Sequence, residues 1–344
     1  MKKAIAILLC CMIFAGIFAG CAQDPAPVNP DPQPSSGGQP DGSNVPDVSN
    51  DPIKIAYIGP LTGSFVTYGT HQRSAIELAV DTLNEAGGIN GAPVVVEWYD
   101  DKSDPNETVN LASKVCDDDS ITTVFGPFST TSAMASAQIL IDAKMPVCSG
   151  SVSHADWSGM GEGRFFRGDS TTSQMMAAYA DFVINDLGVT KVAMYYVQTD
   201  WGQGVYDEFI KAFEPLGGEV VHSDVFQLDQ KDFNASLAKF KEKDDEYELF
   251  FLAGHVNEAS LLVNQMRKLG IEKTILSNNS LQDQVYLDNV GKNAEGQILL
   301  SYFAKSGNTE QFEAWRDKYQ ARFDTPVDTH AFNTTDLINV MFQA

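Results

Sequence analysis

The sequence predicts an α/β protein with two lobes, each built on a parallel β-sheet. Three observations lead to this fold class. Short apolar runs alternate with helical runs from Ile53 onward, the alternation starts again near Lys191, and a helix followed by Gly-Gly and a strand occurs in both halves. Strands that alternate with helices of this length form right-handed βαβ units and parallel sheets. The 344 residues, 43% of them hydrophobic, suffice for two such cores.

The N-terminus predicts export from the cytoplasm. Lys2 and Lys3 precede the apolar stretch 4–19, which is typical of a cleaved signal over residues 1–20. The stretch is short for a membrane-spanning helix, which needs about 20 apolar residues. The residues Phe18-Ala19-Gly20-Cys21 resemble a bacterial lipobox, which implies a lipoprotein anchored to the membrane through Cys21. An ordinary secretory cleavage, with Cys21 as a free thiol, is the alternative.

Residues 21–50 form a predicted tether between this anchor and the folded part. The segment 22–50 holds seven of the fifteen prolines and no leucine, isoleucine, methionine or aromatic residue. Such a segment buries too little apolar area to offset the entropy of ordering it. We therefore expect a disordered, partly extended spacer.

The first half carries local signals for each strand and helix. Predicted strands cover 53–58, 94–99 and 122–125, and a further strand ends near Cys148. Predicted helices cover 73–85 and 131–143, and another helix starts at Pro105. Asp104 is the expected N-cap of that helix, with Pro105 in the first turn and Glu107 at the capping-box position.

The second half repeats the alternation. Its predicted strands cover 191–196, 219–226, 249–253 and 274–276. Its predicted helices cover 205–213, 233–241, 258–269, 309–323 and 332–343. Ligands of open parallel sheets bind beyond the carboxyl ends of the strands, so the loops after these strands are the places to search for a site.

Hydroxyl-rich loops follow two strands of the first half. Ser129, Thr130 and Thr131 follow 122–125 and open a helix, while Ser151 and Ser153 follow the strand that ends near Cys148. Neighbouring parallel strands bring such loops to one edge of the sheet. Helix-start N–H groups and hydroxyls could then hold a carboxylate without any Arg or Lys. An ordinary N-cap is the alternative for the residues around Thr130.

Aromatic and amide side chains follow the strands of the second half. Trp201 follows 191–196, His255 follows 249–253, and Asn279 follows 274–276. A polar cradle on one lobe and aromatic faces on the other suit a small, partly apolar ligand. The alternatives are that Trp201 is an aromatic residue of the core and that His255 is a structural histidine.

Several function classes are disfavoured by charge and by missing motifs. A formal net charge of -23 repels phosphate backbones, so we expect no nucleic-acid partner. The chain lacks a G-x-S-x-G elbow, a P-loop and an H-E-x-x-H motif, and its five histidines form no metal pattern. We therefore expect no enzyme, cofactor or metal. Cys116 and Cys148 remain in the folded part, as a disulfide or as two separate thiols.

Blocks of sequence carry a resemblance to a known family. They are 59–63 (GPLTG) with Tyr68-Gly69, 84–91 (NEAGGING), Asp100-Asp101 with Asp104-Pro105, Gly126 with its Ser/Thr cluster, 201–204 (WGQG) with Tyr206, and 294–296 (AEG). In order and spacing, the chain from Ile53 onward resembles the leucine/isoleucine/valine-binding branch of the type I periplasmic solute-binding proteins.

The resemblance implies two Rossmann-like lobes that close around a ligand at a hinge. The first lobe is expected from 51–170 and 303–344, and the second from 171–302. The implied function is an extracytoplasmic, lipid-anchored binding protein that delivers an amino acid to the permease of an ABC transporter. A sensory binding module of the same fold is an alternative, since nothing in the sequence separates the two.

Ligand-binding residues are implied where this sequence matches the family pattern. They are Tyr68, Phe128, Thr130, Ser151, Ser153, Trp201, His255 and Asn279. The resemblance implies that Thr130 and Ser153 bind the α-carboxylate of the ligand. It also implies that the backbone of Ser151 binds both the carboxylate and the ammonium group. It makes Tyr68 and Phe128 apolar contacts of the first lobe and Trp201 an aromatic contact of the second. His255 stands where the family often has tyrosine.

Departures from the family pattern concern the ligand's ammonium group and the chain length. Asn279 stands where amino-acid binders have Glu, and Thr172 where they have Asp. A charge-assisted hydrogen bond is about twice as strong as a neutral one. The ligand is therefore an amide, a carboxylic acid, or an amino acid held by another acid such as Asp200 or Asp283. Family members also continue for several more elements, so a C-terminal truncation is expected.

Overall fold

The computed structural model describes residues 51–303 and 309–343. The predicted signal (1–20), Cys21 and the predicted tether (21–50) lie outside the described residues. Within the part of the chain that the structure describes, no helix combines the length and apolar character needed to cross a bilayer.

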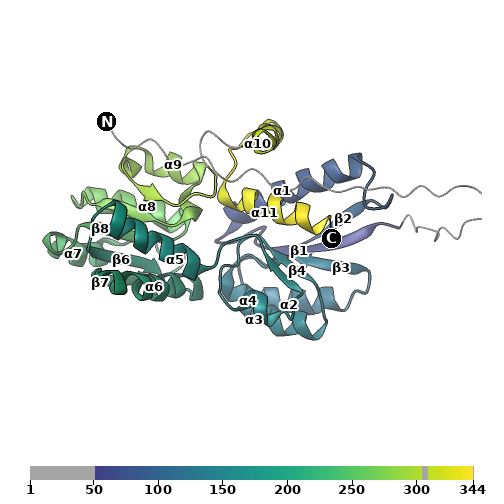
Figure 1. Cartoon of the computed structure of the whole chain (residues 1–344), viewed down its shortest axis with the longest axis horizontal. Coiled ribbons are helices and arrows are strands. Elements are labelled where there is room, and N and C mark those ends of the chain that lie inside the picture. Colours follow the sequence, from purple (N-terminus) through teal and green to yellow (C-terminus); the bar gives the residue numbers. More distant parts are fainter. Residues whose placement is uncertain (1–50, 304–308, 344) are drawn as a thin grey trace, which may run out of the picture. The chain divides into compact units, whose positions relative to one another are not determined.

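The first five strands form one parallel sheet (Figure 1). These strands are β1 (Ile53–Gly59), β2 (Val94–Asp100), β3 (Ile121–Phe125), β4 (Val147–Ser149) and β5 (Phe165–Arg167). Their spatial order is β2-β1-β3-β4-β5, and every pair is parallel. Because β1 and β3 are neighbours although β2 comes between them in the chain, the connections change direction between these two strands.

The next five strands form a second parallel sheet with the same connectivity. They are β6 (Lys191–Val197), β7 (Glu219–Phe226), β8 (Leu249–Ala253), β9 (Thr274–Ser277) and β10 (Ile298–Leu299). Their order is β10-β9-β8-β6-β7, so β6 and β8 occupy the places that β1 and β3 have in the first sheet. The predicted α/β class with two lobes and parallel sheets is therefore confirmed.

Helices alternate with the strands along the chain and cover both faces of each sheet (Figure 1). Those of the first half are α1 (Val66–Glu85), α2 (Pro105–Cys116), α3 (Thr130–Asp142) and α4 (Trp157–Met160). Those of the second half are α5 (Thr172–Asp181), α6 (Asp200–Phe213), α7 (Asn234–Glu242), α8 (Val256–Lys268) and α9 (Gln284–Val290). Short helical turns include the π-helical η1 (Phe182–Asp186) and the 3₁₀-helical η2 (Glu214–Leu216), η3 (Asp244–Glu246), η4 (Asn279–Leu281) and η5 (Gly291–Ala294).

The last two helices return to the first sheet. They are α10 (Glu310–Phe323) and α11 (Thr329–Met341). Helix α11 packs against α1 and β4, and α10 also contacts α1. Both helices begin at side-chain caps, because Thr309 accepts a hydrogen bond from the Phe312 N–H and Asp328 accepts one from the Ala331 N–H.

The central strands hold the core of each sheet. All five residues of β8 are buried, because helices cover both faces of the sheet. A fully buried large apolar side chain contributes about 1.5–3 kcal/mol relative to an exposed one, so such runs supply much of the driving force for folding. This is why the central strands read as continuous apolar segments in the sequence.

Helix α1 begins earlier than predicted. The sequence predicted 73–85, whereas the helix runs from Val66, so Tyr68 lies within α1 rather than in the loop before it. Phe65 occupies the N-cap position and makes no capping hydrogen bond with its side chain, which leaves the sequence without a start signal. Gly69 allows α1 to pack closely against the loop after β1, because a Cβ at this position would lie 1.9 Å from the carbonyl oxygen of Pro60.

Other local predictions compare as follows. Asp104 caps α2, with Pro105 in its first turn, as predicted. The carboxylate of Glu107 pairs with Lys102 at 3.0 Å instead of closing a capping box.

The short strand β5 and the helix α4 were not predicted. Cys116 and Cys148 are both free thiols, so of the two open alternatives the structure has separate thiols.

Candidate functional site

The two places where the connections change direction define the candidate site. In open parallel sheets, ligands bind beyond the carboxyl ends of the strands at this switch point. In the first sheet it lies between the loops after β1 and β3, which carry Phe65 and Phe128. In the second sheet it lies between the loops after β6 and β8. Trp201 lies in the first turn of α6, directly after the first of these loops, and His255 lies in the second. All four of these residues line one cavity.

The cavity has a volume of about 150 Å³. A dry cavity of about that size can hold a benzene-sized molecule, so a small organic ligand fits. Its lining includes seven of the eight residues predicted for the site: Phe128, Thr130, Ser151, Ser153, Trp201, His255 and Asn279. The sequence reasoning missed further lining residues, among them Phe65, Asp169, Thr199 and His330.

Hydroxyl groups and the start of α3 form one wall of the cavity. Ser129 caps α3 by accepting a hydrogen bond from the Ser132 N–H at 3.1 Å, and Thr130 is the first helical residue. The first N–H groups of a helix have no intrahelical acceptor and favour a negative charge. Thr130 and Thr131 both line the cavity, so this end of α3 faces it.

The loop after β4 is tied to the loop after β3. The Ser151 hydroxyl donates to the Phe128 carbonyl oxygen at 2.9 Å, and the Ser149 hydroxyl donates to the Pro127 carbonyl oxygen at 2.8 Å. The Ser153 hydroxyl lies 2.9 Å from that of Thr172. The two hydroxyl-rich loops therefore meet at one edge of the sheet and offer hydrogen-bond groups for an anion.

Aromatic rings from both halves of the chain form a second part of the cavity lining, the aromatic wall. The ring of His255 lies 5.1 Å from Trp201 and 4.8 Å from Phe65, centroid to centroid. Phe65 in turn lies 5.4 Å from Phe128. His330, from α11, lies 5.2 Å from Phe128 and completes this set of rings. Such rings provide a large apolar surface for a ligand side chain.

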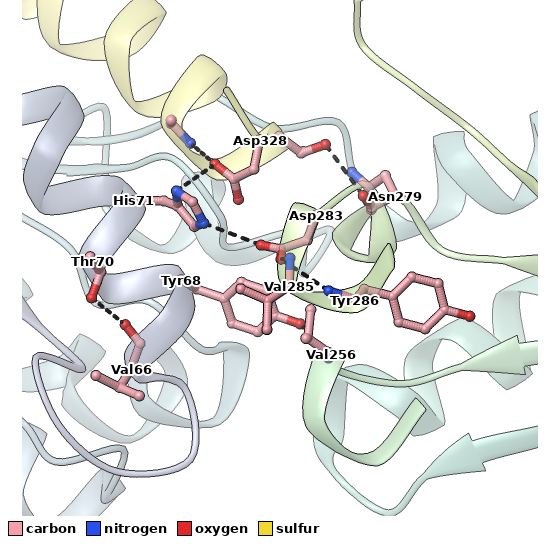
Figure 2. Close-up of polar contacts among 12 residues, drawn as sticks. Val66, Tyr68, Thr70, His71, Val256, Asn279, Asp283, Val285, Tyr286 and Asp328 are labelled. Atoms are coloured by element: carbon pink, nitrogen blue, oxygen red, sulfur yellow. Dashed lines mark hydrogen bonds and ion pairs between the residues drawn. The ribbon is translucent and has the colours of Figure 1, made fainter. Parts of the chain in front are cut away.

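Tyr68 supports the aromatic wall from behind. Its ring stacks on Phe128 at 5.2 Å, and its hydroxyl oxygen accepts a hydrogen bond from the Val256 N–H at 2.9 Å (Figure 2). Tyr68 is not among the residues that line the cavity, unlike the other seven predicted residues. It connects α1 with the start of α8, and so joins elements of the two sheets.

Burial favours the neutral form of both histidines of the cavity. Burial lowers the pKa of His255 to about 3, and the nearby His330 lowers it further in the same direction. Burial also lowers the pKa of His330. The Nδ1 atom of His255 and both ring nitrogens of His330 have no hydrogen-bond partner among the described residues. These buried ring nitrogens are therefore unpaired among the described residues.

His71, Asp283 and Asp328 form a buried cluster (Figure 2). The Nε2 atom of His71 lies 3.2 Å from Asp283 Oδ2, and its Nδ1 atom lies 3.8 Å from Asp328 Oδ1. Burial favours the neutral imidazole, but Asp328 and Asp283 together raise the pKa of His71 to about 9. A protonated imidazole has no free lone pair for a metal, so this cluster is an ion-pair network rather than a ready metal site.

Neither acid that the sequence reasoning proposed for an ammonium group reaches the cavity. Asp283 is engaged with His71 and caps α9 through the N–H groups of Val285 and Tyr286 (Figure 2). Asp200 lies exposed in the first turn of α6. Neither is among the lining residues, whereas Asp169 is.

Comparison with known families gives one match over nearly the whole described chain. The sequence profile of a family described as "Periplasmic binding protein" matches residues 52–344. The match therefore spans both sheets and the two last helices.

Two curated proteins are similar over most of their length. "Leu/Ile/Val-binding protein homolog 3" of Brucella melitensis is 28% identical over 280 residues, which cover 81% of this chain and 74% of that protein. "Leucine-, isoleucine-, valine-, threonine-, and alanine-binding protein" of Pseudomonas aeruginosa is 27% identical over 248 residues, which cover 72% of this chain and 66% of that protein.

Solved structures share the fold. The branched-chain amino acid transporter substrate binding protein LivJ from Streptococcus pneumoniae, in complex with isoleucine, superposes with a TM-score of 0.79 at 26% identity, covering 85% of this chain and 83% of that one. A solute binding protein of an ABC transporter from R. palustris, in complex with benzoate, gives a TM-score of 0.77 at 19% identity, covering 84% and 79%. The second likeness concerns the fold alone.

Proposed function

Because this chain belongs to the periplasmic binding protein family, with the type I fold of two parallel sheets, we propose that it binds an amino acid between its lobes and delivers it to an ABC transporter. Its relatives are solute-binding proteins and not enzymes, in agreement with the absence of catalytic motifs. The family works outside the cytoplasm, which agrees with the export signal expected at 1–20.

The cavity carries this proposal. Hydroxyls and helix-start N–H groups at Thr130, Thr131 and Ser153 provide a cradle for a carboxylate. Phe128 and Trp201 on the aromatic wall suit an aliphatic or aromatic side chain. The relatives named for leucine, isoleucine and valine, and the relative crystallised with isoleucine, support a hydrophobic amino acid as the ligand.

The proposal extends to the parts of the chain that frame the site. We place the first lobe at 51–170 and 303–344 and the second at 171–302, since the chain crosses from the first sheet to the second after β5 and returns after β10. Closure about these crossings would trap the ligand, because binding energy shifts the population towards the closed state. Lipidation at Cys21 would hold the protein at the membrane, near the permease.

A small carboxylate without an amino group is the second candidate ligand. Asn279 lines the cavity where an amino-acid binder is expected to have Glu, and the amide brings no charge for an ammonium group. A sensory role of the same binding protein would share this site.

A thermal-shift screen tests the proposal. The panel holds L-leucine, L-isoleucine, L-valine, their D-enantiomers, benzoate and neutral amides, each added at increasing concentration. At a ligand concentration of 100 times Kd the folded state gains about 2.7 kcal/mol, so the melting temperature should rise by about 5 °C or more with an L-amino acid. The D-enantiomers control for non-specific effects. No shift with any amino acid would refute the proposed ligand class.

A further inference from the structure

An amino-acid ligand brings a positive charge that this cavity must compensate. Burying an uncompensated ammonium group is very costly in free energy. Asn279 supplies no charge, and Asp283 and Asp200 do not line the cavity. Among the described lining residues, Asp169 is the only carboxylate. If the ligand is an amino acid, Asp169 is therefore the candidate partner of its ammonium group.

Asp169 lies next to the groups proposed for the carboxylate of the ligand. It sits between β5 and α5, and hydrogen bonds on both sides of it tie this segment to the loop after β4. The Gly168 N–H donates to the Ser149 carbonyl oxygen at 3.0 Å, and the Thr172 N–H donates to the Ser153 carbonyl oxygen at 2.8 Å. The carboxylate and the ammonium of an α-amino acid are attached to one carbon atom, so their partners must be neighbours in this way.

The carboxylate of Asp169 has hydrogen-bond donors but, among the described residues, no counter-charge in contact. The Tyr302 hydroxyl donates to it, as does the Ser170 N–H. Among residues 51–303 and 309–343, no Lys, Arg or His forms an ion pair with it. The guanidinium of Arg167 instead donates to the carbonyl oxygens of His154 and Ala155 and to the Ser158 hydroxyl.

The environment of this carboxylate favours a cationic ligand. Burial raises the pKa of Asp169 to about 7, although Tyr302, Ser170 and Arg167 act in the opposite direction. A cation placed beside Asp169 would stabilise its charged form. The ammonium group of a ligand in the cavity is such a cation, because Asp169 is among the residues that line the cavity.

We infer that Asp169 binds the ammonium group of the ligand and takes the role that the acid at the position of Asn279 has elsewhere in the family. This inference rests on the proposed function, since it presupposes an amino acid. It makes Asp169 a specificity-determining residue. Amino acids should bind tightly, whereas the same molecules without the amino group should depend little on Asp169.

Calorimetric titration of the Asp169→Asn variant tests the inference. The two probes are L-leucine and 4-methylpentanoate, which is leucine without its amino group, both at pH 8. The variant should bind L-leucine about 10- to 100-fold more weakly, as expected for the loss of a hydrogen bond between charged groups. Its affinity for 4-methylpentanoate should change less than about 3-fold. The matched control is Asp200→Asn, an exposed acid outside the cavity, which should leave both affinities unchanged.

Relocating the charge gives a second, independent readout. The double variant Asp169→Asn with Asn279→Glu should recover L-leucine affinity to within about 10-fold of the wild type, because a carboxylate again faces the cavity. It also keeps the test decisive if Asp169→Asn alone lowers stability. Recovery identifies charge compensation, while continued loss of L-leucine binding in a folded double variant contradicts it.

The dependence of affinity on pH provides a third readout. Protonation of Asp169 should weaken wild-type binding of L-leucine about 100-fold between pH 8 and pH 5. The other titratable groups around the cavity and the loop of Asp169 include Arg167, Tyr302, Asp336, His255 and His330, and they remain present in Asp169→Asn. A steep profile in the wild type and a nearly flat one in the variant are expected. Equal slopes would overturn the inference.

Two failures can be told apart. Wild-type protein that binds no amino acid refutes the proposed function, and the role of Asp169 with it. If the wild type binds L-leucine and Asp169→Asn binds it equally tightly, the proposed function stands and only the role of Asp169 is refuted. Equal weakening of L-leucine and 4-methylpentanoate in the variant also refutes it, because a structural defect would act on both probes.

Discussion

Replacing His71 with Gln should destabilise the protein in a way that depends on pH. His71 lies in α1, and its imidazole sits between Asp283, the N-cap of α9, and Asp328, the N-cap of α11 (Figure 2). The protonated ring therefore holds three helices together and compensates two buried carboxylates. Gln keeps the approximate size of the side chain but removes the charge.

The magnitude follows from the two pKa values of His71. The folded-state pKa is about 9, raised by Asp328 and Asp283 against the effect of burial, whereas an unfolded histidine titrates at about 6.5. Because the folded pKa is the higher one, the stabilisation is fully present below about pH 6.5 and is lost as the pH rises through 9. The difference of about 2.5 in pKa corresponds to about 3 kcal/mol. The same interaction lowers the pKa of Asp283, so it is counted once.

Urea unfolding at pH 6 and pH 10 measures this effect. The free energy of unfolding of His71→Gln should fall below that of the wild type by about 3 kcal/mol at pH 6, and the gap should shrink by about that amount at pH 10. His154→Gln is the control, since His154 forms no ion pair within the described residues and its loss should give a small difference at both pH values. An equal gap for His71→Gln at both pH values would refute the reasoning.

Three further predictions concern single side chains. Tyr68→Phe removes the acceptor of the buried Val256 N–H, so urea unfolding should show a loss of about 1–3 kcal/mol, and an unchanged stability would contradict the contact. Trp201→Ala removes an aromatic face of the cavity and should weaken ligand binding by about 10- to 100-fold in calorimetric titration; an equal affinity would remove Trp201 from the site. Burial raises the pKa of Cys148 to about 11, so in native protein at pH 8 a maleimide should label it far more slowly than in urea; equal rates would show that the thiol is accessible.

The sequence was sufficient where local chemistry decides structure. Strand β8 is a run of five buried apolar residues, and its predicted and observed bounds agree. The N-cap at Asp104 was also predictable, because an Asp-Pro pair at a helix start acts through hydrogen bonds within one turn. The start of α1 was not, since Phe65 offers no side-chain cap and the close approach of Gly69 to Pro60 is a tertiary contact.

The candidate site shows the same limit. Trp201 and His255 were predictable as candidates because each follows a strand that the sequence marks clearly. His330 reaches the cavity from α11, more than 70 residues after β8, and nothing local connects it to the site. Asp169 follows β5, a strand of three residues behind a glycine-rich segment, so the loop that carries it was not recognised as a strand end.

A crystal structure of the protein grown with L-leucine tests the central claim most directly. We predict leucine in the cavity, with its carboxylate within hydrogen-bonding distance of Thr130 at the start of α3 and of Ser153 in the loop after β4. Its side chain should lie between Phe128 and Trp201. Leucine bound elsewhere, or bound in the cavity with its carboxylate against the aromatic wall, would contradict the account.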